Sequence, residues 1–251
     1  MISYNFLKSI AFAAVAVAAV LFVQGSSKPF SFQPDPSLSS TPAPSDNHGY
    51  VDMGLSVKWA TCNLGASSIS DYGDYYAWGE TSPKTVYVWR TYRFTASGDS
   101  WENVKLSKYN TDYNRGTVDN KIILDLSDDA ARAEWGYGWR IPTESEWREL
   151  VDNCTWTWIK LDGSNGYRVT SNLNGNSIFL PAAGESWDTY LRDAAGVNGS
   201  YWSSTLCYDD PMRAWNMNFG STDVLLNRIG SRFSGFAIRP VLTDDELVPI
   251  S

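Results

Sequence analysis

Acidic side chains are the first candidates for chemistry in this sequence. Asp71, Asp74 and Glu80 lie in an aromatic-rich stretch, and Glu144 and Glu146 lie at the start of a predicted helix. Two carboxylates that flank a sugar can hydrolyse a glycosidic bond. Acids at these spacings are also ordinary turn formers and helix caps, and a cap already accounts for Glu146. The sequence therefore favours structural roles for these acids over a glycan-active enzyme.

Histidine and cysteine add little to the catalytic possibilities. His48 is the only histidine, which argues against a Ser-His-Asp triad, a Cys-His pair and a multi-histidine zinc site. Cys62, Cys154 and Cys207 are widely spaced and odd in number. Cys62 and Cys154 could form a disulfide in an exported protein, or they could be small buried residues, and the sequence leaves both open. We predict no catalytic residue, no metal site and no cofactor.

The stretch 201–241 has the pattern of a recognition surface. Short apolar strands at 215–219 and 236–241 alternate with turn-rich segments that carry apolar and aromatic side chains. Side chains on connections between strands need not serve the core, so segments 206–213 and 225–234 are predicted to display a ligand surface. Its aromatic and arginine members are the expected anchors. The predicted ligand-binding residues are Leu206, Tyr208, Asp209, Arg213, Asn216, Asn218, Leu225, Ile229, Arg232 and Phe233.

The frame that must position these residues is predicted to contain two helices. Thr143 and Glu146 have the spacing of a capping box, which predicts a helix over 143–153. A second helix is expected near 128–135, with Ser127 as its N-cap and acids in its first turn. Short strand-like runs separated by turns complete an α+β class with short antiparallel strands. The predicted strands are 57–62, 75–78, 167–171, 177–180, 201–204, 215–219, 223–226 and 236–241.

The N-terminal segment predicts an exported chain. Residues 10–23 form an uncharged run that follows Lys8 and is too short for a usual membrane span, so residues 1–25 read as a signal peptide. The alternative is an uncleaved membrane anchor. Residues 26–48 contain five prolines and seven serines and are predicted to be a linker. A folded domain is expected over 49–243, and residues 244–251 form an acidic tail.

Composition and charge limit the kinds of binding partner that are expected. The chain has 251 residues with 12 Trp, 14 Tyr and 10 Phe, enough to bury one core, and we expect Trp59, Trp139, Trp147 and Trp202 to lie in it. The formal net charge is −8, with basic residues scattered singly, which argues against a nucleic-acid partner. A host or bacterial surface protein, or a glycan, suits an acidic and aromatic surface.

Several segments in a fixed order resemble a known family. They are YVDMGLSVKWATCNLGA (50–66), DYGDYYAWGE (71–80), GWRIPTESEWRELVDNCTW (138–156), SIFLPAAG (177–184), YWSS (201–204) and GFAIRPV (235–241). Together they resemble the Fibrobacter succinogenes major paralogous domain, which is abundant in exported proteins of gut Bacteroidetes. The resemblance implies a C-type-lectin-like fold, in which the first and last strands pair and a long loop region presents ligand-binding side chains. It implies an adhesin-like cell-surface protein, with a structural or tip subunit of a surface fibre as the alternative.

The C-terminal stretch also resembles the variable region of proteins diversified by diversity-generating retroelements. Such regions run from a Y-W-S-S strand to an R-P-V strand, as residues 201–204 and 239–241 do. An ordinary paralogue of fixed sequence is the alternative. The calcium-binding triplets of C-type lectins have no counterpart here, so a bound calcium does not carry over. The candidate variable positions are Leu206, Cys207, Tyr208, Asp209, Met212, Arg213, Asn216, Asn218, Leu225, Leu226, Ile229, Ser231, Arg232 and Phe233.

Overall fold

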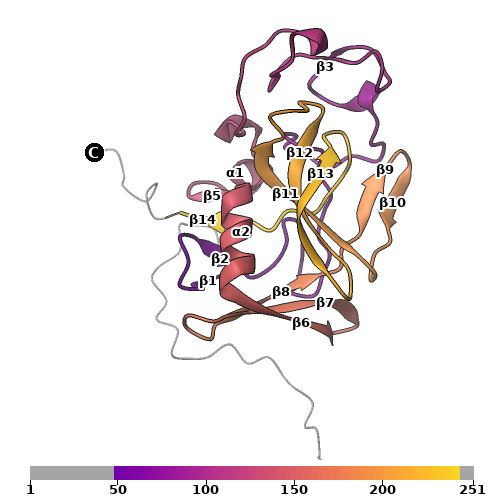
Figure 1. Ribbon diagram of the computed structural model, residues 1–251. Helices are drawn as coiled ribbons and strands as arrows, with labels where there is room; N and C mark the ends of the chain where they lie inside the picture. The colour runs from indigo at the N-terminus through magenta and orange to yellow at the C-terminus, as the bar shows by residue number, and fades with distance from the viewer. Residues whose placement is uncertain (1–47, 244–251) are drawn as a thin grey trace, which may run out of the picture. The chain divides into compact units, whose positions relative to one another are not determined.

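The computed structural model describes residues 48–243, which contain two α-helices and five short antiparallel sheets (Figure 1). The α+β class predicted from the sequence is confirmed for this part of the chain. The predicted signal peptide, nearly all of the predicted linker and the acidic tail lie outside the described residues.

One four-stranded sheet joins the beginning and the end of the described chain. Its order is β1 (Tyr50–Val51), β2 (Lys58–Ala60), β14 (Val241–Leu242) and β5 (Trp139–Arg140). Val241 stands opposite Trp59 on one side and Arg140 on the other. Segments about 180 residues apart are thereby held in register by the backbone.

The remaining strands form two three-stranded sheets and two hairpins. One sheet contains β6 (Cys154–Leu161), β7 (Ser164–Ser171) and β8 (Ser177–Pro181), and the other contains β11 (Gly199–Leu206), β12 (Arg213–Phe219) and β13 (Val224–Ser231). The hairpins are β3 (Thr95–Ser97) with β4 (Lys105–Leu106), and β9 (Glu185–Trp187) with β10 (Tyr190–Asp193). Short 3-10 turns occur at Trp89–Thr91, Tyr113–Arg115 and Leu126–Asp128.

Helix α2 (Glu144–Asn153) begins where the capping box predicts it. Thr143 Oγ1 accepts a hydrogen bond from the Glu146 amide at 3.2 Å, and Glu146 Oε2 accepts one from the Thr143 amide at 2.8 Å. Trp147 and Leu150 are buried, whereas Val151 is only partly covered. Trp147 Nε1 donates to the Trp202 carbonyl at 3.2 Å, which fixes α2 beside the β11–β12–β13 sheet (Figure 1).

Helix α1 (Ala130–Trp135) is shorter than predicted and has a different cap. Asp129, not Ser127, is the N-cap, and its carboxylate accepts from the amides of Arg132 at 3.0 Å and Ile141 at 2.8 Å. Ser127 lies in the preceding 3-10 turn. Asp129 is the cap because its carboxylate also accepts a hydrogen bond from the backbone amide of Ile141, directly after β5. Burial raises the pKa of Asp129 to about 6.

Two predicted strands are mostly extended chain without a ladder. Residues 75–78 make a single bridge, Tyr76 to Phe236, and of the predicted strand 236–241 only Val241 lies in a strand, at the start of β14. The reason is that these segments cross the interior of the domain. The Trp78 amide donates a hydrogen bond to the Arg232 carbonyl, and the Leu64 amide donates one to the Ile238 carbonyl. These segments serve the core rather than a regular sheet.

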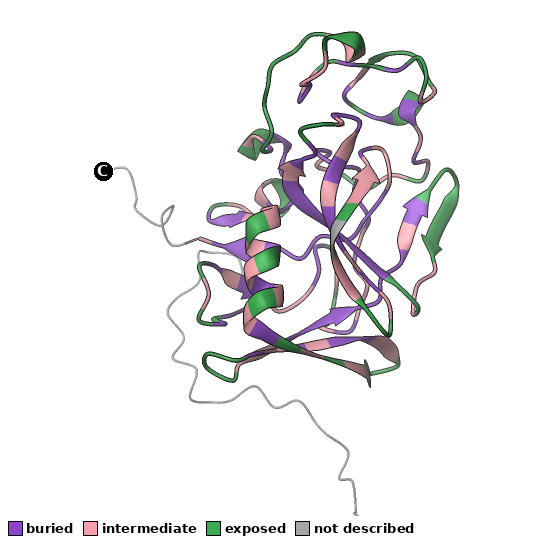
Figure 2. Cartoon of the chain, viewed as in Figure 1, coloured by how far each residue is buried: buried purple, intermediate pink, exposed green. Residues whose placement is uncertain are grey.

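The core contains two aromatic clusters. The first includes Trp202, and the second includes Tyr201, its neighbour in β11. The prediction that Trp59, Trp139, Trp147 and Trp202 are buried is confirmed, since all are at most 1% exposed. Figure 2 shows burial concentrated in the strands behind α2 and exposure on the β10 strand and the outer loops.

The three cysteines form no disulfide, and the single histidine packs against a tryptophan ring. Cys62, Cys154 and Cys207 are all free thiols, so the possible Cys62–Cys154 disulfide is not formed. His48, predicted to lie in the linker, stacks on Trp135 with ring centroids 4.0 Å apart. The packed part of the chain therefore extends to His48.

Candidate ligand-binding surface

The turn between β11 and β12 places two of its side chains, Tyr208 and Asp209, in solvent. Tyr208 is 61% exposed and Asp209 is exposed beside it. The turn is closed by hydrogen bonds from the Cys207 amide to the Arg213 carbonyl and from the Arg213 amide to the Asp210 carbonyl, both 3.0 Å. An exposed aromatic ring on a closed turn is available to a ligand without loss of core packing.

A distant part of the chain completes this surface. Thr111 Oγ1 donates to the Tyr208 carbonyl at 2.7 Å, and the guanidinium of Arg213 lies 4.9 Å from the centre of the Trp101 ring. Arg213 Nε also lies 3.3 Å from Asp210 Oδ2. We call Trp101, Thr111, Tyr208, Asp209 and Arg213 the turn surface.

The contribution of Trp101 and Thr111 was not predicted from the sequence. Their segment carries no strand alternation and reads as an ordinary polar loop. The nearby Tyr113, two residues beyond Thr111, is also strongly exposed. The signal that could have pointed to this loop is its aromatic content within a turn-rich stretch, which is the pattern used for residues 201–241.

Other predicted site residues lie in strands rather than in turns. Trp215 stands opposite Ile229, and Asn218 stands opposite Leu225, across the β12–β13 ladder. Opposed residues of an antiparallel pair share a face of the sheet, so Ile229 and Leu225 point to the same sides as their partners. Ile229, Asn218 and Leu225 are all half-buried. They can contribute only part of their surface to a ligand.

Three predicted site residues belong to the interior, which corrects the expectation that they are displayed. Leu206 ends the buried strand β11, Asn216 is buried in β12, and Arg232 is completely buried. The Oδ1 atom of Asn216 has no hydrogen-bond partner among the described residues. Cys207 and Met212, which are candidate variable positions, are buried as well.

Arg232 sits in an aromatic cage. Its Nη1 donates to the carbonyls of Tyr109 at 3.0 Å and Pro211 at 2.8 Å, its Nη2 to the carbonyl of Lys108 at 3.1 Å, and its Nε to Tyr92 Oη at 2.9 Å. Its guanidinium carbon lies 4.9 Å from the centre of the Trp78 ring. Among the described residues, none of its hydrogen bonds goes to a carboxylate. Arg232 therefore ties three connecting segments of the domain together instead of facing a ligand.

Phe233 also has a packing role. Its ring meets Trp89 edge-on with centroids 4.9 Å apart, and it packs against the first aromatic cluster while remaining partly exposed. A ligand could touch only its outer edge. The side chain of Leu226, another candidate variable position, is outside the described residues.

The acids considered for hydrolysis have structural partners. Asp71 accepts hydrogen bonds from the amide and hydroxyl of Ser67, both 3.1 Å, and the amide bond lowers the pKa of Asp71. Glu80 is buried and pairs with Lys84 at 2.9 Å. Burial acts to raise the pKa of Glu146, but the ion pair with Arg140 outweighs it and lowers that pKa. Asp71, Glu80 and Glu146 are therefore already used by the fold.

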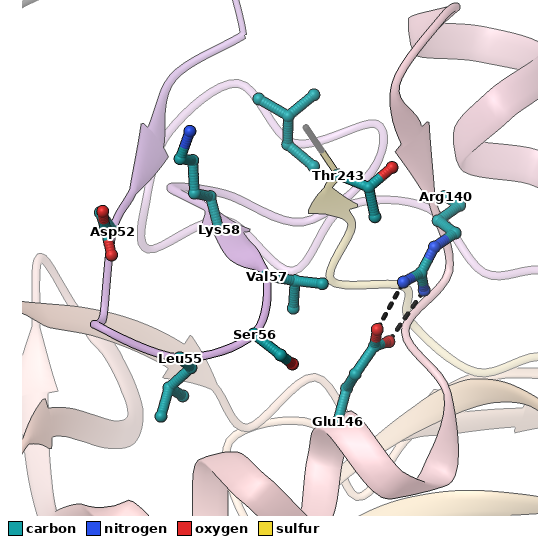
Figure 3. Close-up of a pocket in the computed structure, with 9 residues that line it drawn as sticks. Asp52, Leu55, Ser56, Val57, Lys58, Arg140, Glu146 and Thr243 are labelled. Atoms are coloured by element: carbon teal, nitrogen blue, oxygen red, sulfur yellow. Dashed lines mark hydrogen bonds and ion pairs between the residues drawn. The ribbon is translucent and has the colours of Figure 1, made fainter. Parts of the chain in front are cut away.

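A polar pocket of about 390 Å³ lies beside the β1–β2 connection, at the N-terminal end of α2. Figure 3 shows Arg140 and Glu146 pointing toward each other at its edge, where they form a two-pronged ion pair. Glu146 also caps α2, so the pair is already used by the fold. The pocket is lined by Asp52, Leu55, Ser56, Val57, Lys58, Arg140, Glu146, Leu242 and Thr243.

A function for this chain has to be inferred from its geometry, because comparison with known proteins gives no match. No family model, curated protein or solved structure matches this chain. Within residues 48–243 there is no helix long and apolar enough to cross a membrane. In the same range no three His, Cys, Asp or Glu side chains gather in the manner of a metal site.

Proposed function

We propose that this chain is an exported, adhesin-like protein of the cell surface that binds a protein or glycan through the turn surface. The observation that carries the proposal is the exposed Tyr208 ring beside the Arg213–Trp101 contact, on a turn whose backbone is fixed at both ends. Aromatic and arginine side chains dominate binding energies at interfaces. A rigid frame that displays them lowers the entropic cost of binding.

In this proposal, the C-type-lectin-like fold and the cell-surface location are inferred from the resemblance to the Fibrobacter succinogenes major paralogous domain. Pairing of β2 with β14 and two helices beside small antiparallel sheets are compatible with a C-type-lectin-like domain. Export is proposed from the N-terminal segment as well. Fold resemblance does not transfer function, so the ligand class is left to experiment.

Burial bears on the proposed diversification of residues 201–241. Cys207, Met212 and Asn216 are buried, as are Leu206 and Arg232, and free variation at such positions would remove core contacts. This favours a paralogue of fixed sequence over unrestricted diversification. Any variation compatible with folding would concentrate at the exposed turn.

The test is binding of the full-length protein to an array that carries both glycans and surface proteins. The double variant Tyr208→Ala/Arg213→Ala should lose the signal and keep its melting temperature, because both side chains are at least partly in solvent. A signal that survives in the folded double variant would place the binding site elsewhere.

A further inference from the structure

The β9–β10 hairpin carries an exposed aromatic pair that is separate from the turn surface. Trp187 is 43% exposed and Tyr190 is 58% exposed, and Leu191 next to them is also exposed. All four residues of β10 are exposed, as Figure 2 shows in green. Large rings in solvent at a hairpin end do not contribute to the core.

The two rings form a tilted stack. Their centroids are 4.7 Å apart and their planes are tilted by 31°. Each ring therefore covers part of one face of the other, and the outer faces are left for another flat group. Trp187 Nε1 donates to Asp193 Oδ2 at 3.1 Å, which fixes the orientation of the indole ring.

The backbone beneath the rings is held firmly. Ser186, next to the exposed Trp187, is buried and exchanges hydrogen bonds of 2.7 and 2.8 Å with Gly235. Asp188 exchanges bonds of 2.8 and 2.9 Å with Tyr87, whose ring is in the core. The hairpin is thus attached to the core at two points, one on each side of Trp187.

The hairpin also stores backbone strain. Asp188, Arg192 and Ala194 have φ values of 50°, 60° and 56°, in the left-handed region that non-glycine residues seldom adopt. Such residues persist where the surrounding structure fixes them, and they cluster at ligand sites. A fixed ring stack needs little ordering when a ligand binds, which favours affinity.

The chemistry around the rings selects the ligand. We infer that the β9–β10 hairpin is a glycan-binding platform on which a neutral pyranose ring stacks against Tyr190 and Trp187. The C–H bonds on one face of a pyranose match the electron-rich face of an aromatic ring. Asp188 and Asp193 at the edges can accept hydrogen bonds from its hydroxyl groups.

Other ligand classes fit less well. The carboxylates and the net charge of −8 repel acidic polymers. A stable protein partner generally needs an interface of more than about 1,000 Å² in total, much larger than one ring stack. The inference does not rest on the turn surface, because it uses a different hairpin and different residues.

The experiment is affinity electrophoresis of the full-length protein through gels that contain one neutral polysaccharide each: mixed-linkage β-glucan, xyloglucan, arabinoxylan, galactomannan or glycogen. Polygalacturonate serves as the acidic comparison. The variants are Tyr190→Ala, Trp187→Ala and the ring-retaining Tyr190→Phe. Tyr113→Ala, which removes an exposed ring elsewhere, is the matched control.

At least one neutral polysaccharide should retard the wild-type protein. Tyr190→Ala and Trp187→Ala should weaken that binding about tenfold or more, equivalent to about 1.4 kcal/mol. Tyr190→Phe and Tyr113→Ala should bind like the wild type, and all variants should melt normally. If Trp187→Ala fails to fold, Tyr190→Ala decides.

Three results would overturn the inference. They are no retardation of the wild type by any neutral polysaccharide, unchanged binding in folded Tyr190→Ala, and stronger retardation by polygalacturonate than by any neutral polymer. Loss of a protein partner on an array in Tyr190→Ala, with no glycan bound by the wild type, would assign the hairpin to a protein interface instead.

Discussion

Replacement of Arg232 by alanine should destabilise this protein more than most single substitutions. The side chain is fully buried and donates to the carbonyls of Lys108, Tyr109 and Pro211, and to the hydroxyl of Tyr92. Alanine would remove every donor and leave a cavity between four aromatic rings. Only water entering that cavity could replace the lost hydrogen bonds.

The expected magnitude follows from the groups left behind. A buried carbonyl deprived of its donor costs about 1–3 kcal/mol, so three of them cost about 3–9 kcal/mol before relaxation. Partial hydration of the cavity reduces this, and we expect Arg232→Ala to lower the free energy of unfolding by about 4–6 kcal/mol. Arg232→Lys keeps the charge but not the planar fork, and it should cost about 2–4 kcal/mol.

The assay is urea denaturation followed by tryptophan fluorescence. Arg213→Ala is the matched control, because Arg213 is half-exposed and makes one ion pair and one cation–π contact. Its loss should cost no more than about 1 kcal/mol. Equal effects of Arg232→Ala and Arg213→Ala on stability would refute the assignment of Arg232 to the core.

Substitutions at three further residues test the frame. Thr143→Ala should cost about 1 kcal/mol through loss of the α2 cap, while Thr143→Ser should be nearly neutral, as judged by melting temperature. Trp202→Ala should cost about 3–5 kcal/mol in urea, because its buried ring stacks on Phe236, and a loss below about 1 kcal/mol would contradict that packing. Burial raises the pKa of Asp129 to about 6 from its ordinary value of 3.8, so between about pH 4 and pH 6 the folded chain holds a proton that the unfolded chain releases. Its contribution to stability is therefore present below about pH 4 and lost as the pH rises through 6, and Asp129→Asn should gain up to about 3 kcal/mol relative to the wild type between pH 4 and pH 7. Parallel stability curves for the two proteins over that range would refute this pKa.

Local signals predicted the elements that are determined locally. The α2 helix follows from the Thr143–Glu146 capping box, which acts within four residues. The start of α1 was misjudged because Ser127 and Asp129 are both good caps, and the choice depends on a contact with Ile141, 12 residues away. Burial of Trp202 followed from its place in an apolar strand.

The sequence did not predict strand β6, because no turn-forming residue separates it from helix α2. Asn153 ends α2 and Cys154 begins β6 directly, with no glycine or proline between them. The alternation of Thr and Trp in residues 154–158 is the period-two signal that could have predicted it. The helix immediately before it obscured that signal.

The candidate site was predicted in part. Tyr208 and Asp209 are exposed on a turn as expected, because nothing distant covers them. Arg232 and Leu206 also stand among turn-forming residues, but segments that are distant in sequence close over them. Tyr92 and Tyr109 lie 140 and 123 residues from Arg232. A contact of that separation leaves no trace in the local pattern.

The most direct test of the proposed function is the dissociation constant of Tyr208→Ala for whichever array ligand the wild type binds. Tyr137→Ala, at an exposed ring outside the turn surface, is the matched control. The turn surface predicts that Tyr208→Ala weakens binding about tenfold or more at unchanged melting temperature, and that Tyr137→Ala binds normally. Equal dissociation constants for Tyr208→Ala and the wild type would contradict the proposed site.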